Sequence, residues 1–157
     1  MTDELPSTVE IFYSYSQKDE MLREELDNHL SALKELGVIK GWHDGQITAG
    51  TERKKEIDQR LMTAQIILLL ISADFLSTNY CGDDEMKFAM KRHESREAVV
   101  IPVMLRSVDW KGMPFEKLEA LPKGAKAVMD WDNLDQAFTN VAKGIRVVVD
   151  ELIANPR

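Results

Sequence analysis

The sequence predicts an α/β fold in which helices cover both faces of a parallel sheet. Residues 65–71 carry the run IILLLI without a polar break, as expected of a strand that is buried on both faces. Segments with strand character alternate with segments of helix character five times, and such alternation produces right-handed crossovers between parallel strands. We therefore predict a doubly wound, three-layer fold.

The first predicted unit is a strand at residues 9–13, where β-branched and aromatic side chains gather. Ser16 followed by Asp19 is typical of a helix start, and Gly37 is typical of a helix end. Between them, leucines recur at helical spacing: Leu22, Leu26, Leu30, Leu33 and Leu36. One amphipathic helix is expected for this stretch.

The second unit is less apolar. Residues 38–43 have weaker strand character, and the glycines of residues 44–50 indicate a loop. Residues 51–63 fit a polar helix whose inward side chains are Ile57 and Leu61.

The third and fourth units complete the central part of the fold. Residues 72–82 contain helix-breaking residues, and residues 83–94 fit a helix. Residues 98–105 are the fourth predicted strand, in which Pro102 favours a position where no ladder donor is needed. A long loop is expected at residues 106–126.

The last unit is a short edge strand at residues 127–131 and a helix with one apolar stripe. The stripe consists of Leu134, Phe138, Val141, Ile145, Val148 and Leu152. Five strands favour a flavodoxin-like parallel sheet of order 2-1-3-4-5 with helices on both faces. Because no repeat or linker divides the chain, we expect a single domain over residues 1–157, with its core at residues 8–153.

This strand order predicts where a ligand binds. In such sheets, ligands lie outside the carboxyl ends of the strands, at the point where the strand order reverses. Here the reversal falls between strands 1 and 3, which end at residues 13–16 and 72–75. A crevice between these two segments is the predicted site.

The composition excludes several classes of protein. The 157 residues include 20 Lys+Arg and 27 Asp+Glu, and the resulting net charge of −7 argues against nucleic acid or an anionic membrane as the partner. With Cys81 as the only cysteine, an internal disulfide, a CxxC pair and a thiolate metal cage are excluded. No signal peptide or bilayer-spanning run is visible, so a cytoplasmic protein is predicted.

Familiar cofactor and metal motifs do not fit the sequence either. No GxGxxG follows the first strand, and the GxxxxG at residues 45–50 continues without the Lys that a phosphate loop needs. The histidines His29, His43 and His93 have no metal-ligand spacing. Neither a bound cofactor nor a metal is expected.

Glu85 is the candidate catalytic residue because of its position. It falls in the first turn of the helix that follows strand 3, so this helix start overhangs the predicted crevice. Asp83 and Asp84 precede it, and the simpler interpretation is three acids that are favoured by the helix dipole. The residue types alone leave both interpretations open.

Several short segments occur in a specific order and spacing. They are IFYSYS at 11–16, GWHD at 41–44, ITAG at 47–50, SADFL at 72–76, and Tyr80-Cys81 followed by Glu85-Met86. In this order they resemble the TIR (Toll/interleukin-1 receptor) domain, and its bacterial branch in particular. IPV at 101–103 and the segment 109–122 also match that branch, so the resemblance covers nearly the whole chain.

The resemblance implies one of two roles. Many bacterial TIR domains hydrolyse NAD at the nicotinamide–ribose bond, and some cyclise the product into a signalling nucleotide, often in antiphage defence. Animal receptor and adaptor TIR domains are instead scaffolds that assemble through their surfaces. The catalytic glutamate of the family falls on Glu85, so an NAD glycohydrolase is expected, with NAD as substrate and no cofactor.

Other expectations follow from the same resemblance. The enzyme would be activated when it associates with other TIR protomers into a homo-oligomer or filament, with a fused or associated sensor domain as a further partner. The alternatives are a non-catalytic TIR–TIR interaction module and a nucleotide-sensing domain without turnover.

The resemblance also implies a set of substrate-binding residues. They are Tyr15, Ser16, Asp44, Gly45, Gln46, Ile47, Ser77, Tyr80 and Cys81. Residues 44–47 would fold over the site or dock on a neighbouring protomer, and Cys81 is expected to be a wall residue and not a nucleophile. Bacterial relatives commonly carry an aromatic residue shortly after the glycine of this loop, where this chain has Arg53.

Overall fold

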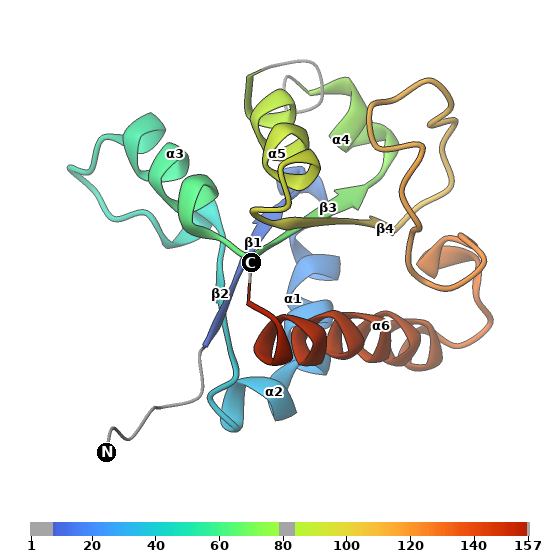
Figure 1. Ribbon diagram of the computed structural model, residues 1–157. Coiled ribbons are helices and arrows are strands. Elements are labelled where there is room, and N and C mark those ends of the chain that lie inside the picture. Colours follow the sequence, from blue (N-terminus) through green and yellow to red (C-terminus); the bar gives the residue numbers. More distant parts are fainter. Residues whose placement is uncertain (1–7, 79–83, 157) are drawn as a thin grey trace.

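Four parallel strands form the sheet of the computed structural model, which describes residues 8–78 and 84–156 (Figure 1). The strands are β1 (Val9–Ser14), β2 (Ile39–Trp42), β3 (Ile66–Ile71) and β4 (Val99–Met104). Their order is β2-β1-β3-β4, so the strand order reverses between β1 and β3 as predicted. Every residue of β3 is buried, which agrees with its uninterrupted apolar run.

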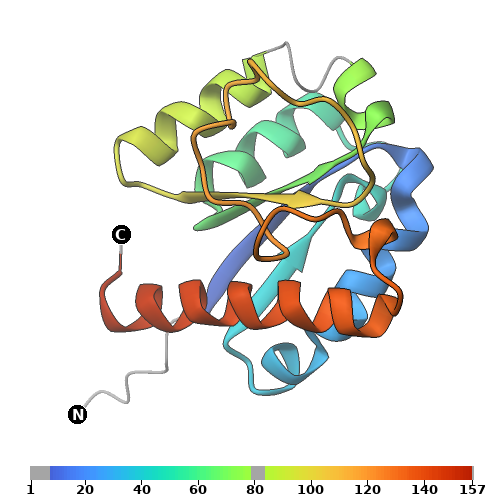
Figure 2. The same cartoon turned by 90° about the vertical axis from the view of Figure 1, so that its right-hand side faces the viewer.

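Helices cover both faces of this sheet (Figures 1 and 2). One face carries α1 (Glu20–His29), α2 (Ser31–Glu35) and α6 (Leu134–Ala154). The other face carries α3 (Arg53–Thr63), α4 (Ala73–Ser77) and α5 (Asp84–Glu94). Side chains alternate between these layers along each strand, so that Ile11 and Tyr13 of β1 pack with the first group and Phe12 with the second.

The leucine-rich segment forms two helices in place of the single helix that was predicted. The backbone turns at Leu30, where ψ is 7°, and separates α1 from α2. Leu22, Leu26 and Leu33 are buried as expected, whereas Leu36 is 67% exposed. Gly37 ends the segment with φ +73°, a left-handed conformation that glycine adopts without a steric penalty.

The segment after β3 also differs from the prediction, because the expected helix-breaking stretch contains α4. Ser72 caps this short helix, and its Oγ accepts the Phe75 amide hydrogen at 3.1 Å. Phe75 has no exposed surface and anchors the helix in the core.

The fifth strand predicted at residues 127–131 is wrong. This segment contains the 3-10 turn η3 (Val128–Asp130), from which Val128 reaches the core with no exposed surface. A turn buries this side chain without a partner strand, so the apolar content of the segment did not require a strand.

The outer edge of β4 pairs with one residue, Leu121, in the described part of the chain. The Leu121 amide donates to the Pro102 carbonyl at 2.9 Å, and the Met104 amide donates to the Leu121 carbonyl at 2.8 Å. The next amide that could donate to β4 is that of Lys123, and it donates instead to Asn140 Oδ1 at 2.9 Å. Pro102 itself sits where its missing donor would face this outer edge, as predicted.

No helix in the described residues is long and apolar enough to cross a membrane.

Candidate active site

The polar side chains at the reversal point begin with η1 (Gln17–Asp19), the turn between β1 and α1. Consecutive side chains of this turn reach different strand ends. Gln17 Nε2 donates to Asp44 Oδ1 at 3.2 Å, in the loop after β2. Lys18 Nζ lies 3.5 Å from Asp74 Oδ1, in α4 after β3.

Asp19 makes the innermost contacts of this turn. Its side chain has no exposed surface and accepts hydrogen bonds from Ser72 Oγ, at the end of β3, and from Arg106 Nε, after β4, the latter at 2.9 Å. A buried carboxylate is stable when its oxygens are bonded in this way. Together, the three side chains of η1 link the ends of all four strands.

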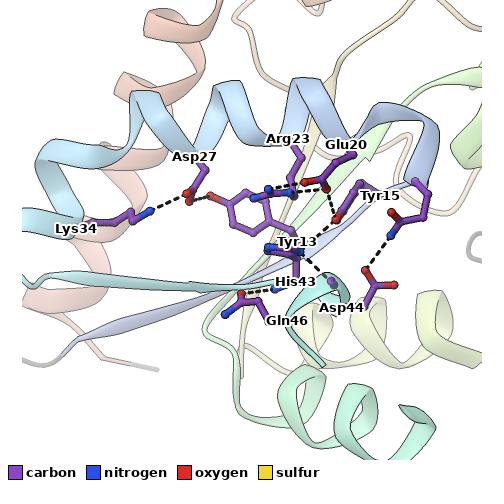
Figure 3. A network of polar contacts seen from close by, with 11 residues as sticks. Tyr13, Tyr15, Glu20, Arg23, Asp27, Lys34, His43, Asp44 and Gln46 are labelled. Carbon is purple, nitrogen blue, oxygen red and sulfur yellow. Dashed lines mark hydrogen bonds and ion pairs between the residues drawn. The ribbon is translucent and has the colours of Figure 1, made fainter. Parts of the chain in front are cut away.

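Tyr15 lies in a second polar network beneath the loop after β2 (Figure 3). Its hydroxyl donates to Glu20 Oε1 at 2.6 Å and lies 3.2 Å from His43 Nδ1. Glu20 also accepts two hydrogen bonds from Arg23, at 3.0 and 2.9 Å. The Arg23 guanidinium lies over the rings of both Tyr13 and Tyr15, 5.7 Å from each centroid.

The charges of this network shift its pKa values. The hydrogen bonds from Arg23 and Tyr15 lower the pKa of Glu20 to about 2 against the cost of partial burial. Burial, and then the bond to Glu20, raises the pKa of the Tyr15 hydroxyl. Tyr15 is therefore a neutral donor that is already bound to Glu20, and its hydroxyl is not poised to act as a base.

The loop after β2 turns through η2 (Asp44–Gln46) and is held by His43. The His43 Nδ1 accepts the Gly45 amide hydrogen at 3.2 Å, and the His43 amide donates to Gln46 Oε1 at 3.1 Å. Gly45 and Gln46 are exposed, whereas Ile47 is half-buried and packs against the α3–α5 side of the core. A β-carbon on Gly45 would lie 2.8 Å from the His43 ring, which explains glycine at this position.

Arg53 takes part in the same loop. Its Nη2 lies 2.6 Å from Asp44 Oδ2, and the Asp44 side chain is only 10% exposed whereas that of Arg53 is 58% exposed. Arg53, at the position where the resemblance leads one to expect an aromatic residue, thus pairs with one of the predicted substrate-binding residues.

Glu85 lies in the first turn of α5 and is half-buried. It lines a small hollow over the carboxyl end of β1 together with Ser14, Tyr15 and Asp44. The hollow measures about 10 Å³, which leaves room for about one water molecule. The structure therefore brings the predicted catalytic residue and two predicted binding residues to one narrow hollow.

Glu85 also borders an open groove between α3 and α5, of about 340 Å³. Its apolar wall consists of Leu61, Met62 and Phe88, of which Met62 is 57% exposed. The acids that line it are Asp58, Asp84 and Glu85. They raise the pKa of Lys54, mainly through its hydrogen bond to Asp58 and less through the charges of Glu85 and Asp84. A volume of this size is at the lower end for a small-molecule site.

The remaining predicted residues have different outcomes. Ser16 is buried and its Oγ accepts the Lys18 amide hydrogen at 3.3 Å, so it shapes η1 and presents no free surface. Ser77 is exposed and its hydroxyl donates to the Asp74 carbonyl of its own helix at 3.1 Å. It does not line the hollow at Glu85. Tyr80 and Cys81 lie outside the described residues.

Sequence reasoning missed the roles of Asp19 and Arg106 and one group of metal-binding residue types. In the part of the chain that the structure describes, Glu25 and His29 of α1 meet Asp135 of α6 with their ligand atoms within 4.8 Å of one another. The Glu25–His29 spacing of four residues was a signal in the sequence, but the third member comes from the other end of the chain. The His29–Asp135 contact of 3.4 Å has the geometry of an ordinary surface ion pair.

Comparison with known families identifies the class of protein. The model of the TIR domain family matches residues 11–143, and the chain belongs to this family. The family includes members that cleave NAD, and TIR domains generally associate with one another or with other TIR domains.

Among individual proteins, the chain is similar to the uncharacterized protein y4lF of Sinorhizobium fredii. The two are 50% identical over 136 residues, which is 87% of this chain and 42% of that protein. The chain thus spans less than half the length of this relative.

Proposed function

We propose that this TIR domain is an NAD glycohydrolase in which Glu85 is the catalytic residue. The observation that carries the proposal is the carboxylate of Glu85 at the carboxyl end of β1, beside Tyr15 and Asp44. Such a position, at the reversal point of a doubly wound sheet, is where these folds bind nucleotides.

One carboxylate is sufficient for this reaction. The bond between ribose C1′ and the nicotinamide nitrogen breaks, and its electron pair neutralises the pyridinium, so nicotinamide leaves without a general acid. Glu85 can accept hydrogen bonds from the ribose hydroxyls and stabilise the oxocarbenium ion that develops. Water then adds to C1′ and releases a proton, whereas attack by another atom of the nucleotide would give a cyclic product.

The small size of the hollow supports activation by self-association. Because it holds about one water, a ribose fits there only after Asp44 and its loop move away from β1. This loop is fastened to the domain by Asp44, through Arg53 and Gln17. A neighbouring TIR protomer that binds the loop would supply the energy to open it, so we propose a homo-oligomer or filament as the active form.

The biological setting belongs to the same proposal. A cytoplasmic enzyme of bacterial defence, controlled by a fused or associated sensor, is consistent with a chain that matches only part of a longer relative.

The test is nicotinamide release from NAD at high protein concentration, measured by chromatography. We expect Glu85→Gln to lower the rate by about 100-fold or more, because it removes the negative charge that faces the oxocarbenium ion. The matched control is Asp84→Asn, the exposed acid next to it, which should stay within a few-fold of the wild type. Equal rates for Glu85→Gln and wild type, or no release by the wild type when association is forced, would exclude the proposal.

A non-catalytic TIR–TIR interaction module is the second candidate. The observation that favours it is the exposed apolar wall of the α3–α5 groove, where Met62 and Phe88 face solvent. Association without NAD cleavage, abolished by Met62→Ser and unaffected by Glu85→Gln, would support this function over hydrolysis.

A further inference from the structure

We infer that Arg106 binds the pyrophosphate of the dinucleotide, held ready for it by the buried carboxylate of Asp19. The inference rests on the proposed function for the identity of the ligand, and on the structure for the site itself.

The Arg106 guanidinium is anchored along one edge. Its Nε donates to Asp19 Oδ1 at 2.9 Å, and its side chain is 44% exposed while that of Asp19 is fully buried. Among residues 8–78 and 84–156, no hydrogen bond or ion pair of the two Nη nitrogens is found. The two Nη nitrogens of Arg106 therefore remain available as donors, and together they can bind a phosphate in bidentate fashion.

The anchor itself cannot turn. The second oxygen of Asp19 accepts the Ser72 hydroxyl, and Ser72 Oγ in turn accepts the Phe75 amide hydrogen at 3.1 Å. Because each member of this chain of contacts is held by the next, the Nε edge of the guanidinium is restrained before any ligand binds. Such preorganisation reduces the entropy that binding would otherwise cost.

The guanidinium also lies where the nucleotide is expected. Arg106 follows β4, yet its partner Asp19 follows β1 and the residue bonded to that partner, Ser72, ends β3. These contacts place the guanidinium at the carboxyl ends of β1 and β3. A doubly wound sheet binds its ligand at this edge.

Two further cations at these strand ends also pair with carboxylates. Lys18 Nζ lies 3.5 Å from Asp74, and Arg53 Nη2 lies 2.6 Å from Asp44. The chain carries a net charge of −7, so an anionic ligand gains no attraction from the overall field and needs directed donors. The Nη pair of Arg106 meets this need, and phosphate oxygens are the acceptors that it fits.

The experiment compares ligands with and without phosphate. Binding of ADP-ribose and of adenosine is measured by isothermal titration calorimetry for the wild type, Arg106→Gln and the control Arg146→Gln. Arg146 is an exposed residue of α6 on the far layer, and its substitution changes the net charge equally. Cleavage of NAD and of nicotinamide riboside, which lacks phosphate, is measured on the same three proteins.

We expect Arg106→Gln to weaken ADP-ribose binding by roughly 10- to 100-fold, as for other hydrogen bonds to charged groups. The KM for NAD should rise by a similar factor with little change in kcat, while nicotinamide riboside cleavage, adenosine binding and the Arg146→Gln protein stay unchanged. Equal losses with both substrates would assign Arg106 a purely structural role and overturn the inference, as would unchanged ADP-ribose binding. If the wild type cleaves neither substrate, the proposed function fails, but the ADP-ribose arm still decides the inference.

Discussion

The turns after β1 and after β2 lie side by side at the carboxyl ends of the strands and are held in opposite ways. In η1, Asp19 has no exposed side-chain surface and is bonded to residues that follow β3 and β4. In η2, Gly45 and Gln46 are exposed, and the ion pair that fastens the turn ends on Arg53, which is 58% exposed. This difference indicates that η1 is part of the folded core, whereas the contacts that hold η2 are exposed to solvent and are weakened by it.

The largest effect should come from η1. Asp19→Ala leaves the buried Ser72 hydroxyl and the Arg106 guanidinium without their shared acceptor, so we expect the free energy of unfolding to fall by about 3 kcal/mol. Urea denaturation measures this change. The control Asp150→Ala, at an exposed position of α6, should stay within about 0.5 kcal/mol of the wild type. If Asp19→Ala lowered the free energy of unfolding as little as the control does, η1 would not be the more firmly held of the two turns.

An intermediate effect is expected at His43, which holds η2. Burial, and then the charge of Arg23, lowers the pKa of His43 below its ordinary value of 6.5, although Glu20, Asp44 and Asp27 act in the opposite direction. Because the folded pKa is the lower one, the unfolded chain takes up the proton first, and stability is lost as the pH falls below about 6.5. The protonated ring no longer accepts the Gly45 amide, a hydrogen bond worth about 1 kcal/mol.

Two measurements test the His43 prediction. The ring proton signals of His43 should titrate by NMR with a midpoint below 6.5, and a midpoint at or above that value would contradict it. The difference in unfolding free energy between wild type and His43→Gln should shrink between pH 7 and pH 5. A difference that stays constant over this range would show that the ring nitrogen does not hold η2.

The smallest effect should come from Arg53→Gln. The Arg53 side chain is 58% exposed, and an ion pair that water can reach contributes little, so the free energy of unfolding should change by less than about 0.5 kcal/mol. The amides of residues 45–47 should nevertheless exchange with deuterium roughly twofold faster, because a local opening becomes easier by that amount. Lys54→Gln, which removes a similar pair with Asp58 inside α3, is the control and should leave these amides unchanged. Equal exchange in both variants would mean that Arg53 does not hold η2 in place.

Much of the fold could be predicted because it is encoded locally. The uninterrupted apolar run of β3, the inward Ile57 and Leu61 of α3 and the glycine at the end of α2 each appear as specified by neighbouring residues. The fifth strand was wrong because burial of Val128 was attributed to strand pairing, whereas a turn achieves it. The break at Leu30 carries no glycine or proline, so it had no local signal.

The candidate site was likewise predictable from the sequence only in part. Topology predicted that the start of the helix after β3 would overhang the end of β1, and Glu85 of that helix lines one hollow with Tyr15 and Asp44. The sequence suggested Asp19 only as part of a helix start, since its partners Ser72 and Arg106 lie 53 and 87 residues away. Contacts over such separations leave no periodic pattern, and the tertiary structure is needed to find them.

The single pairing of Leu121 with β4 has a consequence for how copies of this domain can meet. Unpaired strand edges invite edge-to-edge addition of strands from other molecules, which leads to uncontrolled aggregation. Here Leu121 occupies the Pro102 carbonyl and the Met104 amide, and Pro102 offers no hydrogen of its own. Addition of a foreign strand at the β4 border of the sheet is therefore discouraged.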